Sequence, residues 1–143
     1  MLKGINPIIS PELLKVLCEM GHGDHLVIAD GNFPAASNAK RLIRMDGHGV
    51  PEVLDAILSL FPLDQYVEKQ VSLMEVCKGD TVVPTIWEKY KEIIAKYEPD
   101  AQIEFLERFD YYDEAKKAYA IIATSESAQY ANVILKKGCI IKK

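Results

Sequence analysis

The chain has 143 residues, of which 49% are hydrophobic and 27% charged, and its 17 basic and 21 acidic side chains give a formal net charge of −4. This length and balance are typical of one globular domain, spanning residues 1–143, and exclude a disordered chain. The mild negative charge, with basic residues scattered along the chain, argues against nucleic acid and anionic membrane surfaces as partners.

Neither a membrane span nor a secretion signal is expected. No apolar run approaches the ~20 residues that cross a bilayer, and residues 1–4 lack the apolar stretch of a signal peptide. Cys18, Cys77 and Cys139 are widely spaced without a CxxC pair, so they indicate neither a disulfide framework nor a zinc site. We interpret them as small apolar residues of a cytoplasmic protein.

Helical and strand-like patterns alternate along the chain. Ser10 and Pro11 are typical of a helix start, because the hydroxyl caps the first turn and proline needs no hydrogen bond there. The run 26–29 is too short for a helix and β-branched in its middle, which predicts a buried strand that ends at Asp30. In chain order, we expect helices over 11–20, 51–61, 84–97 and 112–117, and strands over 26–29, 41–45, 71–76, 103–106, 118–123 and 133–135.

Interleaved helices and strands predict a three-layer α/β domain. In such folds, ligands bind beyond the carboxyl ends of the strands, where the loops converge. Polar side chains in those loops are therefore the candidates for a functional site.

His22 and Asp30 are the first candidates, because they flank the short strand 26–29. A histidine exchanges a proton near neutral pH, and a carboxylate can orient it or hold a substrate hydroxyl, so the pair can perform acid–base chemistry. The alternative is that Gly21 and Gly23 form a turn in which His22 is merely exposed. Spacing alone leaves both interpretations open.

A metal site is a further possibility. His22, Asp24, His25, Asp46 and His48 carry imidazole and carboxylate groups, which are ordinary ligands of zinc and its neighbours. They show no HExxH or comparable spacing, which favours the interpretation that they are unrelated polar residues scattered over loops. No P-loop or dinucleotide fingerprint is present either, so the sequence indicates no metal and no nucleotide cofactor.

The segments 107–112 and 129–132 are rich in polar and aromatic residues beside predicted strands. Carboxylate, amide and guanidinium groups that bind hydroxyls, together with aromatic faces, suit a sugar. Alternatively, the tyrosines are half-buried core residues with a solvated hydroxyl. Trp87 and Tyr90, in the helix 84–97, are interpreted as core or subunit-contact residues.

Several motifs, in the same order along the chain, resemble those of one known family. They occupy 9–14, 20–24 with the HGD motif, 32–35, 62–64 with the PLD motif, 108–112, 114–118 and 130–138. Together they resemble the RbsD/FucU family of sugar mutarotases, and within it the L-fucose branch. The resemblance implies an RbsD-like fold with a mixed central sheet flanked by helices. It also implies an isomerase that interconverts the α and β anomers of a monosaccharide without a cofactor.

The resemblance further implies roles for single residues. His22 corresponds to the family's proton donor, Asp30 to a substrate-binding aspartate and Asp64 to an active-site aspartate. The positions that line the sugar pocket in relatives are Met74, Arg108, Tyr112, Tyr130 and Asn132. Relatives assemble as decamers of two stacked pentameric rings, with pockets near subunit contacts.

Anomer exchange needs an acid that protonates the ring oxygen and a base that takes the proton of the anomeric hydroxyl. We expect His22 to be the acid. The base is expected to be Asp64, or a water held by Tyr130 or Tyr112. The ring then opens to an aldehyde, which rotates and closes on its other face.

L-fucose is the favoured substrate and D-ribose the alternative. Ala131 and Ser125 stand where fucose relatives usually carry glycine, and ribose pyranases carry alanine at the first of these positions. Arg108 stands where the ribose branch tends to carry histidine, and the PLD motif also favours fucose. The remaining alternatives are a non-catalytic sugar-binding oligomer that assists transport and, third, a metal-dependent hydrolase.

Overall fold

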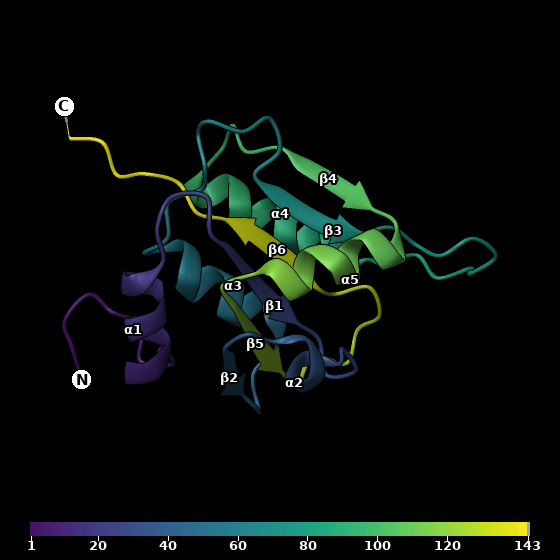
Figure 1. The fold of residues 1–143 in the computed structure, drawn as a ribbon, viewed down its shortest axis with the longest axis horizontal. Helices are drawn as coiled ribbons and strands as arrows, with labels where there is room; N and C mark the ends of the chain where they lie inside the picture. The colour runs from purple at the N-terminus through teal and green to yellow at the C-terminus, as the bar shows by residue number, and fades with distance from the viewer. Residues whose placement is uncertain (143) are drawn as a thin grey trace.

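The computed structural model describes residues 1–142, so Lys143, the end of the expected domain, lies outside the described residues. The chain folds into a six-stranded sheet with helices on both faces (Figure 1). The strands are β1 His25–Ala29, β2 Leu42–Met45, β3 Val71–Met74, β4 Ile103–Leu106, β5 Ala120–Thr124 and β6 Val133–Lys136. The helices are α1 Pro11–Glu19, α2 Ala35–Asn38, α3 Val50–Leu58, α4 Ile86–Tyr97 and α5 Arg108–Lys117.

The sheet is mixed, as expected, with the strand order β2-β5-β1-β6-β3-β4. Strands β2, β5 and β1 are parallel to one another, β3 is parallel to β4, and β6 is antiparallel to both β1 and β3. The carboxyl ends of β1, β3 and β4 therefore share one edge of the sheet with the amino end of β6. At the opposite edge, the carboxyl end of β6 lies beside the loops that lead into β1 and β3.

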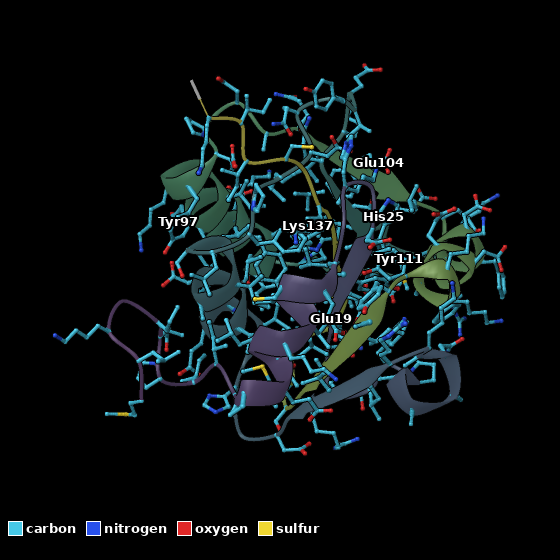
Figure 2. The ribbon with its side chains drawn as sticks, turned by 60° about the vertical axis from the view of Figure 1, so that its left-hand side comes forward. Glu19, His25, Tyr97, Glu104, Tyr111 and Lys137 are labelled. Atoms are coloured by element: carbon cyan, nitrogen blue, oxygen red, sulfur yellow. The ribbon has the colours of Figure 1, made fainter. Side chains whose placement is uncertain are left out.

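Two apolar clusters, one on each face of the sheet, confirm the three-layer arrangement. Helices α1, α3 and α4 cover one face, where Leu13, Leu54 and Tyr90 pack with strand residues of β1, β3, β5 and β6. Helices α2 and α5 cover the other face, where Tyr111 and Ala115 are fully buried. Figure 2 shows Tyr111 between α5 and the sheet. Because both faces of β1 are covered, its residues 26–29 are all apolar and buried, as the short run predicts.

The helix ends are set by local hydrogen bonds. Ser10 Oγ accepts a hydrogen bond from Leu13 N–H at 3.1 Å, which confirms the predicted start of α1. Helix α5 begins at Arg108 rather than at the expected Tyr112, because the Glu107 carboxylate accepts hydrogen bonds from the first N–H groups of the helix. The short helix α2 was not expected, since its four residues carry no apolar periodicity.

The three cysteines lie at different depths in the fold. Cys18 is exposed, and Cys77 and Cys139 are partly buried, all three as free thiols. Within residues 1–142, no helix has both the length and the apolar character required to span a bilayer.

Candidate active site

A pocket of about 300 Å³ opens where the carboxyl ends of β1, β3 and β4 meet the amino end of β6. This is the edge at which ligands bind in open α/β sheets. The pocket is lined by Asp30, Asn32, Phe33, Met74, Cys77, Asp80, Arg108, Tyr112, Gln129, Tyr130 and Asn132. The fold thus brings together the six expected substrate-binding residues, which come from four separate segments of the chain.

Asp30, directly after β1, lies at the buried end of this pocket. It is 7% exposed, and its Oδ1 accepts a hydrogen bond from Asn32 N–H at 3.0 Å. Its own N–H donates to Asn132 Oδ1 at 2.7 Å, which joins the ends of β1 and β6. Burial raises the pKa of the Asp30 carboxyl above its usual range, against the lowering effect of nearby N–H groups. An additional donor, such as a sugar hydroxyl, would therefore stabilise the charged form.

Arg108 and two aromatic rings form another wall of the pocket. The rings of Phe33 and Tyr112 are 5.5 Å apart, and the guanidinium carbon of Arg108 lies 5.6 Å from the Tyr112 ring centre. Arg108 is the first residue of α5, where the helix dipole disfavours a positive charge. Helix stability therefore does not explain an arginine here, where it lines the pocket.

Tyr130 is held from two sides. Its φ of 55° is in the left-handed region, which is uncommon for a residue other than glycine. Its carbonyl accepts a hydrogen bond from Trp87 Nε1 at 2.8 Å, and the next carbonyl, that of Ala131, accepts one from Tyr90 Oη at 2.7 Å. Tyr90 is a core residue, as expected, but both aromatic residues of α4 also fix the backbone that carries Tyr130 and Asn132.

Besides Gln129, which belongs to the expected segment 129–132, four lining residues were not among the expected site residues: Asn32, Phe33, Cys77 and Asp80. The first two follow β1 and the others follow β3, so the rule that ligands bind beyond strand ends could have identified them. No separate signal in the sequence points to Asp80, which lies in a loop without apolar periodicity.

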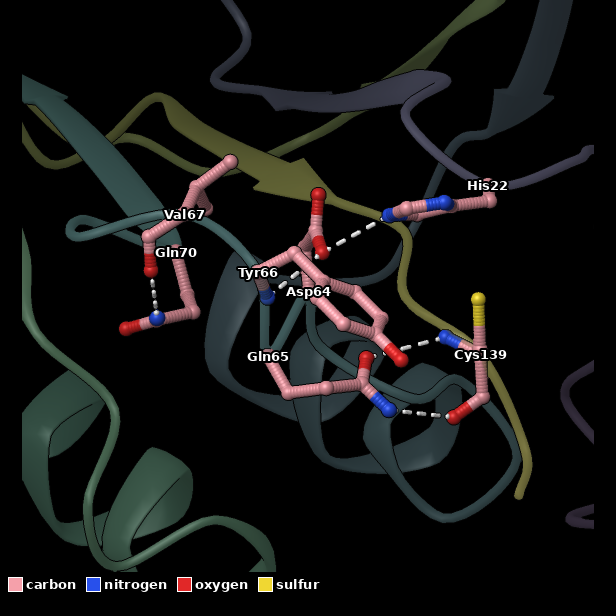
Figure 3. Close-up of polar contacts among 7 residues, drawn as sticks. All are labelled: His22, Asp64, Gln65, Tyr66, Val67, Gln70 and Cys139. Carbon is pink, nitrogen blue, oxygen red and sulfur yellow. Dashed lines mark hydrogen bonds and ion pairs between the residues drawn. The ribbon is translucent and has the colours of Figure 1, made fainter.

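His22 and Asp64 form a pair at the opposite edge of the sheet. His22 Nε2 lies 2.9 Å from Asp64 Oδ1, which also accepts a hydrogen bond from Tyr66 N–H at 3.0 Å (Figure 3). The Tyr66 ring lies beside the imidazole, with 5.3 Å between ring centres. Burial alone would raise the pKa of Asp64, but the hydrogen bonds from Tyr66 N–H and His22, with the nearby imidazoles, hold it below its usual range.

His22 and Asp30 therefore do not pair within one chain. His22 precedes β1 and Asp30 follows it, so the length of the strand separates them. Hydrogen bonds from Gly23 N–H to the Lys137 carbonyl and from Asp64 N–H to the Lys136 carbonyl hold His22 and Asp64 beside the end of β6 instead. Within one chain, the sugar-sized pocket and the imidazole occupy opposite edges of the sheet.

The polar residues considered for a metal site are dispersed. His48 Nδ1 lies 3.0 Å from Glu52 Oε2, and Asp46 is paired with Arg44. In the part of the chain that the structure describes, no group of three or more histidine, cysteine, aspartate or glutamate side chains is placed to hold a metal ion.

Comparison with known proteins gives a consistent result. The model of the RbsD / FucU transport protein family matches residues 3–140. The L-fucose mutarotase of Actinobacillus pleuropneumoniae serotype 5b (strain L20) is 52% identical over 139 residues, which cover 96% of each protein. A crystal structure of the fucose mutarotase from Streptococcus pneumoniae in complex with L-fucose is 52% identical, with a TM-score of 0.94, and the match covers 98% of this chain and 100% of that one.

A more distant structure shares the fold. Bacillus subtilis RbsD complexed with D-ribose is 21% identical, with a TM-score of 0.74, over 99% of this chain and 100% of that one. The match to the family model over nearly the whole sequence, the high identity of full-length relatives and the common mixed sheet lead to one conclusion. The chain belongs to the RbsD/FucU family.

Proposed function

We propose that this protein is an L-fucose mutarotase, an isomerase that interconverts the α and β anomers of L-fucose by opening and closing the sugar ring. The observation that carries the proposal is the sugar-sized pocket with Asp30, Arg108, Tyr130 and Asn132 at the carboxyl edge of the sheet. The proposal is supported by the fucose mutarotase from Streptococcus pneumoniae, whose structure was solved in complex with L-fucose. That protein is 52% identical to this chain over 98% of this chain.

The proposed roles follow from the chemistry of the lining residues. The carboxylate of Asp30 and the amide of Asn132 anchor sugar hydroxyls, and Arg108 donates hydrogen bonds to them. Met74 and Tyr112 present apolar surface, which suits the methyl group and C–H face of a deoxy sugar. This set of residues binds a monosaccharide without a metal or an organic cofactor.

His22 is proposed as the acid that protonates the ring oxygen. Since Asp64 Oδ1 already accepts two hydrogen bonds, Asp64 is better suited to orienting the imidazole than to removing a proton from the sugar. The other candidate for the base that takes the proton of the anomeric hydroxyl is a water held by Tyr130 or Tyr112.

The separation of the two halves of the site supports a homo-oligomer. If His22 is the acid, a second copy of the chain must bring its imidazole to the pocket of the first. Tyr66, beside His22, is 67% exposed, and Val67 is also exposed, which is typical of a surface that another subunit covers. We propose an assembly of the kind implied by the family resemblance, a decamer of two pentameric rings.

The proposed domain extent, localisation and partners are those expected from the composition and from the family resemblance. The whole chain, 1–143, acts as one mutarotase domain in the cytoplasm. Nucleic acid and membranes are not partners, and the ligand is a monosaccharide, with D-ribose as the alternative to L-fucose.

One observation favours a second candidate function, a non-catalytic monosaccharide-binding protein that assists transport. The pocket of a single chain holds hydroxyl-binding groups but not the imidazole, so it is sufficient for binding without turnover. The family description also refers to transport. The acid–base pair of His22 and Asp64 favours the enzyme, because binding alone does not need an imidazole held by a buried carboxylate.

Exchange NMR tests the proposal by following magnetisation transfer between the anomers of L-fucose, with D-ribose in parallel. We expect the protein to accelerate exchange of fucose, and His22→Ala to abolish this acceleration. His48→Ala, which removes another partly exposed histidine paired with a carboxylate, is the matched control and is expected to keep full activity. Acceleration of ribose only would change the substrate, and binding of fucose without acceleration would support the transport candidate.

A further inference from the structure

Asp80 lies behind the hydroxyl of Tyr130 at the mouth of the sugar pocket. Tyr130 Oη donates a hydrogen bond to Asp80 Oδ2 at 2.5 Å and accepts one from Cys77 N–H at 3.3 Å. The other oxygen of Asp80, Oδ1, accepts a hydrogen bond from Val82 N–H at 3.0 Å. The loop after β3 thus aims this carboxylate at the phenol, which Trp87 holds through the Tyr130 carbonyl.

This geometry fixes the direction of the Tyr130 hydrogen bond. A phenol has one proton, and here that proton points to a carboxylate that also accepts a backbone N–H, as an ionised group does. The hydrogen bond from Tyr130 is the main cause that holds the pKa of Asp80 below its usual range. The Tyr130 oxygen is therefore an acceptor toward the pocket, where a sugar hydroxyl can donate to it.

Tyr130 needs this partner if it is to remove a proton. The Asp80 carboxylate raises the pKa of Tyr130 to about 12, so the phenol stays protonated near neutral pH. A neutral phenol accepts a proton from a sugar only if its own proton leaves at the same time. Asp80 is the group placed to receive it, whereas the pocket's other carboxylate, Asp30, is hydrogen-bonded to backbone N–H at the buried end.

We propose that Asp80 acts through Tyr130 as the proton acceptor of ring opening, so that the two residues form a relay for the proton of the anomeric hydroxyl. This inference rests on the proposed mutarotase function and names the base which that function leaves open. Asp80 is a positioning residue that takes the phenol proton, and Tyr130 is the catalytic residue that touches the sugar.

The step balances in protons and electrons. The anomeric O–H bond breaks, its proton passes to Tyr130 Oη, and the original phenol proton passes to Asp80 Oδ2. The electron pair of the O–H bond forms the carbonyl of the aldehyde as the bond from the anomeric carbon to the ring oxygen breaks. The ring oxygen takes a proton from the acid, and the same transfers in reverse close the ring on the other face.

The decisive variant is Asp80→Asn. In either orientation its amide keeps a hydrogen bond to the phenol, but it cannot receive a proton at neutral pH. We expect the maximal exchange rate to fall by about 10²-fold or more, while the fucose concentration for half-maximal rate stays within about twofold. Asp80→Glu is expected to recover part of the rate, because it restores a carboxylate to the same loop.

Two further variants control the interpretation. Glu75→Gln removes one negative charge close to the same loop without altering a pocket-lining residue, and is expected to keep the full rate. The double variant Asp80→Asn with Tyr130→Phe is expected to be no slower than the more damaging single variant, since the two residues act in series. Melting temperatures show whether each variant remains folded.

Three results would overturn the relay. A wild-type rate in Asp80→Asn would show that the base is elsewhere, for example Asp30 or a bound water. A loss confined to fucose affinity, with an unchanged maximal rate, would reduce Asp80 to a binding role. If the wild-type protein binds fucose without accelerating exchange, the proposed function itself fails. This failure differs from a failure of the relay alone, because the wild-type rate is measured before that of any variant.

Discussion

The imidazole Nε2 of His22 lies 2.9 Å from Asp64 Oδ1, which joins two residues 42 positions apart in the sequence. The Asp64 side chain is 4% exposed, whereas the His22 side chain remains 45% exposed. A buried carboxylate behind an accessible imidazole fixes the orientation of the ring. This relationship suits an imidazole that gives a proton to a ligand brought by another molecule.

Asp64→Asn is expected to slow anomer exchange by about 10²-fold, because a neutral amide stabilises the imidazolium far less than a carboxylate does. Exchange NMR on L-fucose measures the effect. The matched control is Glu52→Gln, which makes the equivalent change in the His48–Glu52 pair and is expected to leave the rate unchanged. An Asp64→Asn protein that is folded and fully active would contradict this role.

The same carboxylate gives a pH dependence of stability. Because hydrogen bonds hold the pKa of Asp64 below its usual range, its charged form stabilises the fold at pH values above about 4, the ordinary pKa of an unfolded aspartate. This contribution falls as the pH drops through the lower pKa of the folded state. Urea unfolding from pH 7 to 3 should therefore show wild type more stable than Asp64→Asn at neutral pH, with a difference that shrinks in acid.

Asp30→Asn is expected to stabilise the protein while it abolishes fucose binding. Burial raises the pKa of Asp30, so its charge costs free energy at neutral pH that an amide does not. A gain of about 1 kcal/mol would raise the melting temperature by roughly 4 °C in a domain of this size. Scanning calorimetry measures stability and titration calorimetry measures fucose affinity; a lower melting temperature with intact binding would contradict both expectations.

The strands and most helices could be predicted from the sequence, because apolar spacing and capping residues are local signals. Ser10 caps α1 as predicted, and the apolar run 26–29 became β1. The start of α5 was placed late, since its first turn has no apolar periodicity and depends on the Glu107 carboxylate.

The two halves of the candidate site could not be located from local pattern alone. The meeting of His22 with Asp64 depends on which strand lies beside β1, and the sequence does not show that β6 enters antiparallel between β1 and β3. Likewise, the bond between Tyr130 and Asp80 joins residues 50 positions apart. The resemblance to a family indicated the candidate site residues, but only the fold shows which of them share a pocket.

Trp87→Phe is expected to weaken fucose binding about three- to tenfold, because it removes the N–H that holds the Tyr130 carbonyl. Phenylalanine preserves the aromatic packing against Phe105, whose ring centre is 4.9 Å away. The control on the same helix is Tyr97→Phe, which removes a hydroxyl that donates to Asp55. Titration calorimetry should show a loss of affinity in the first variant only; equal affinities would show that the indole N–H does not position the site.

Complementation between two inactive variants tests whether a second copy completes the pocket. His22→Ala keeps the Asp30 pocket and Asp30→Asn keeps the imidazole, so each variant alone should be inactive. When they are co-expressed in equal amounts and assemble at random, about one quarter of the shared sites combine an intact pocket with an intact imidazole. We therefore expect about a quarter of the wild-type rate of fucose exchange.

The control for this experiment is co-expression of His22→Ala with Asp64→Asn. Both substitutions alter the same edge of the sheet, where His22 and Asp64 are hydrogen-bonded to each other. No mixed site then contains an intact acid pair, so we expect no recovery beyond the residual activity of the separate variants. Recovery only in the first mixture requires that the pocket and the imidazole come from different chains, whereas failure in both mixtures would contradict a site shared between two copies.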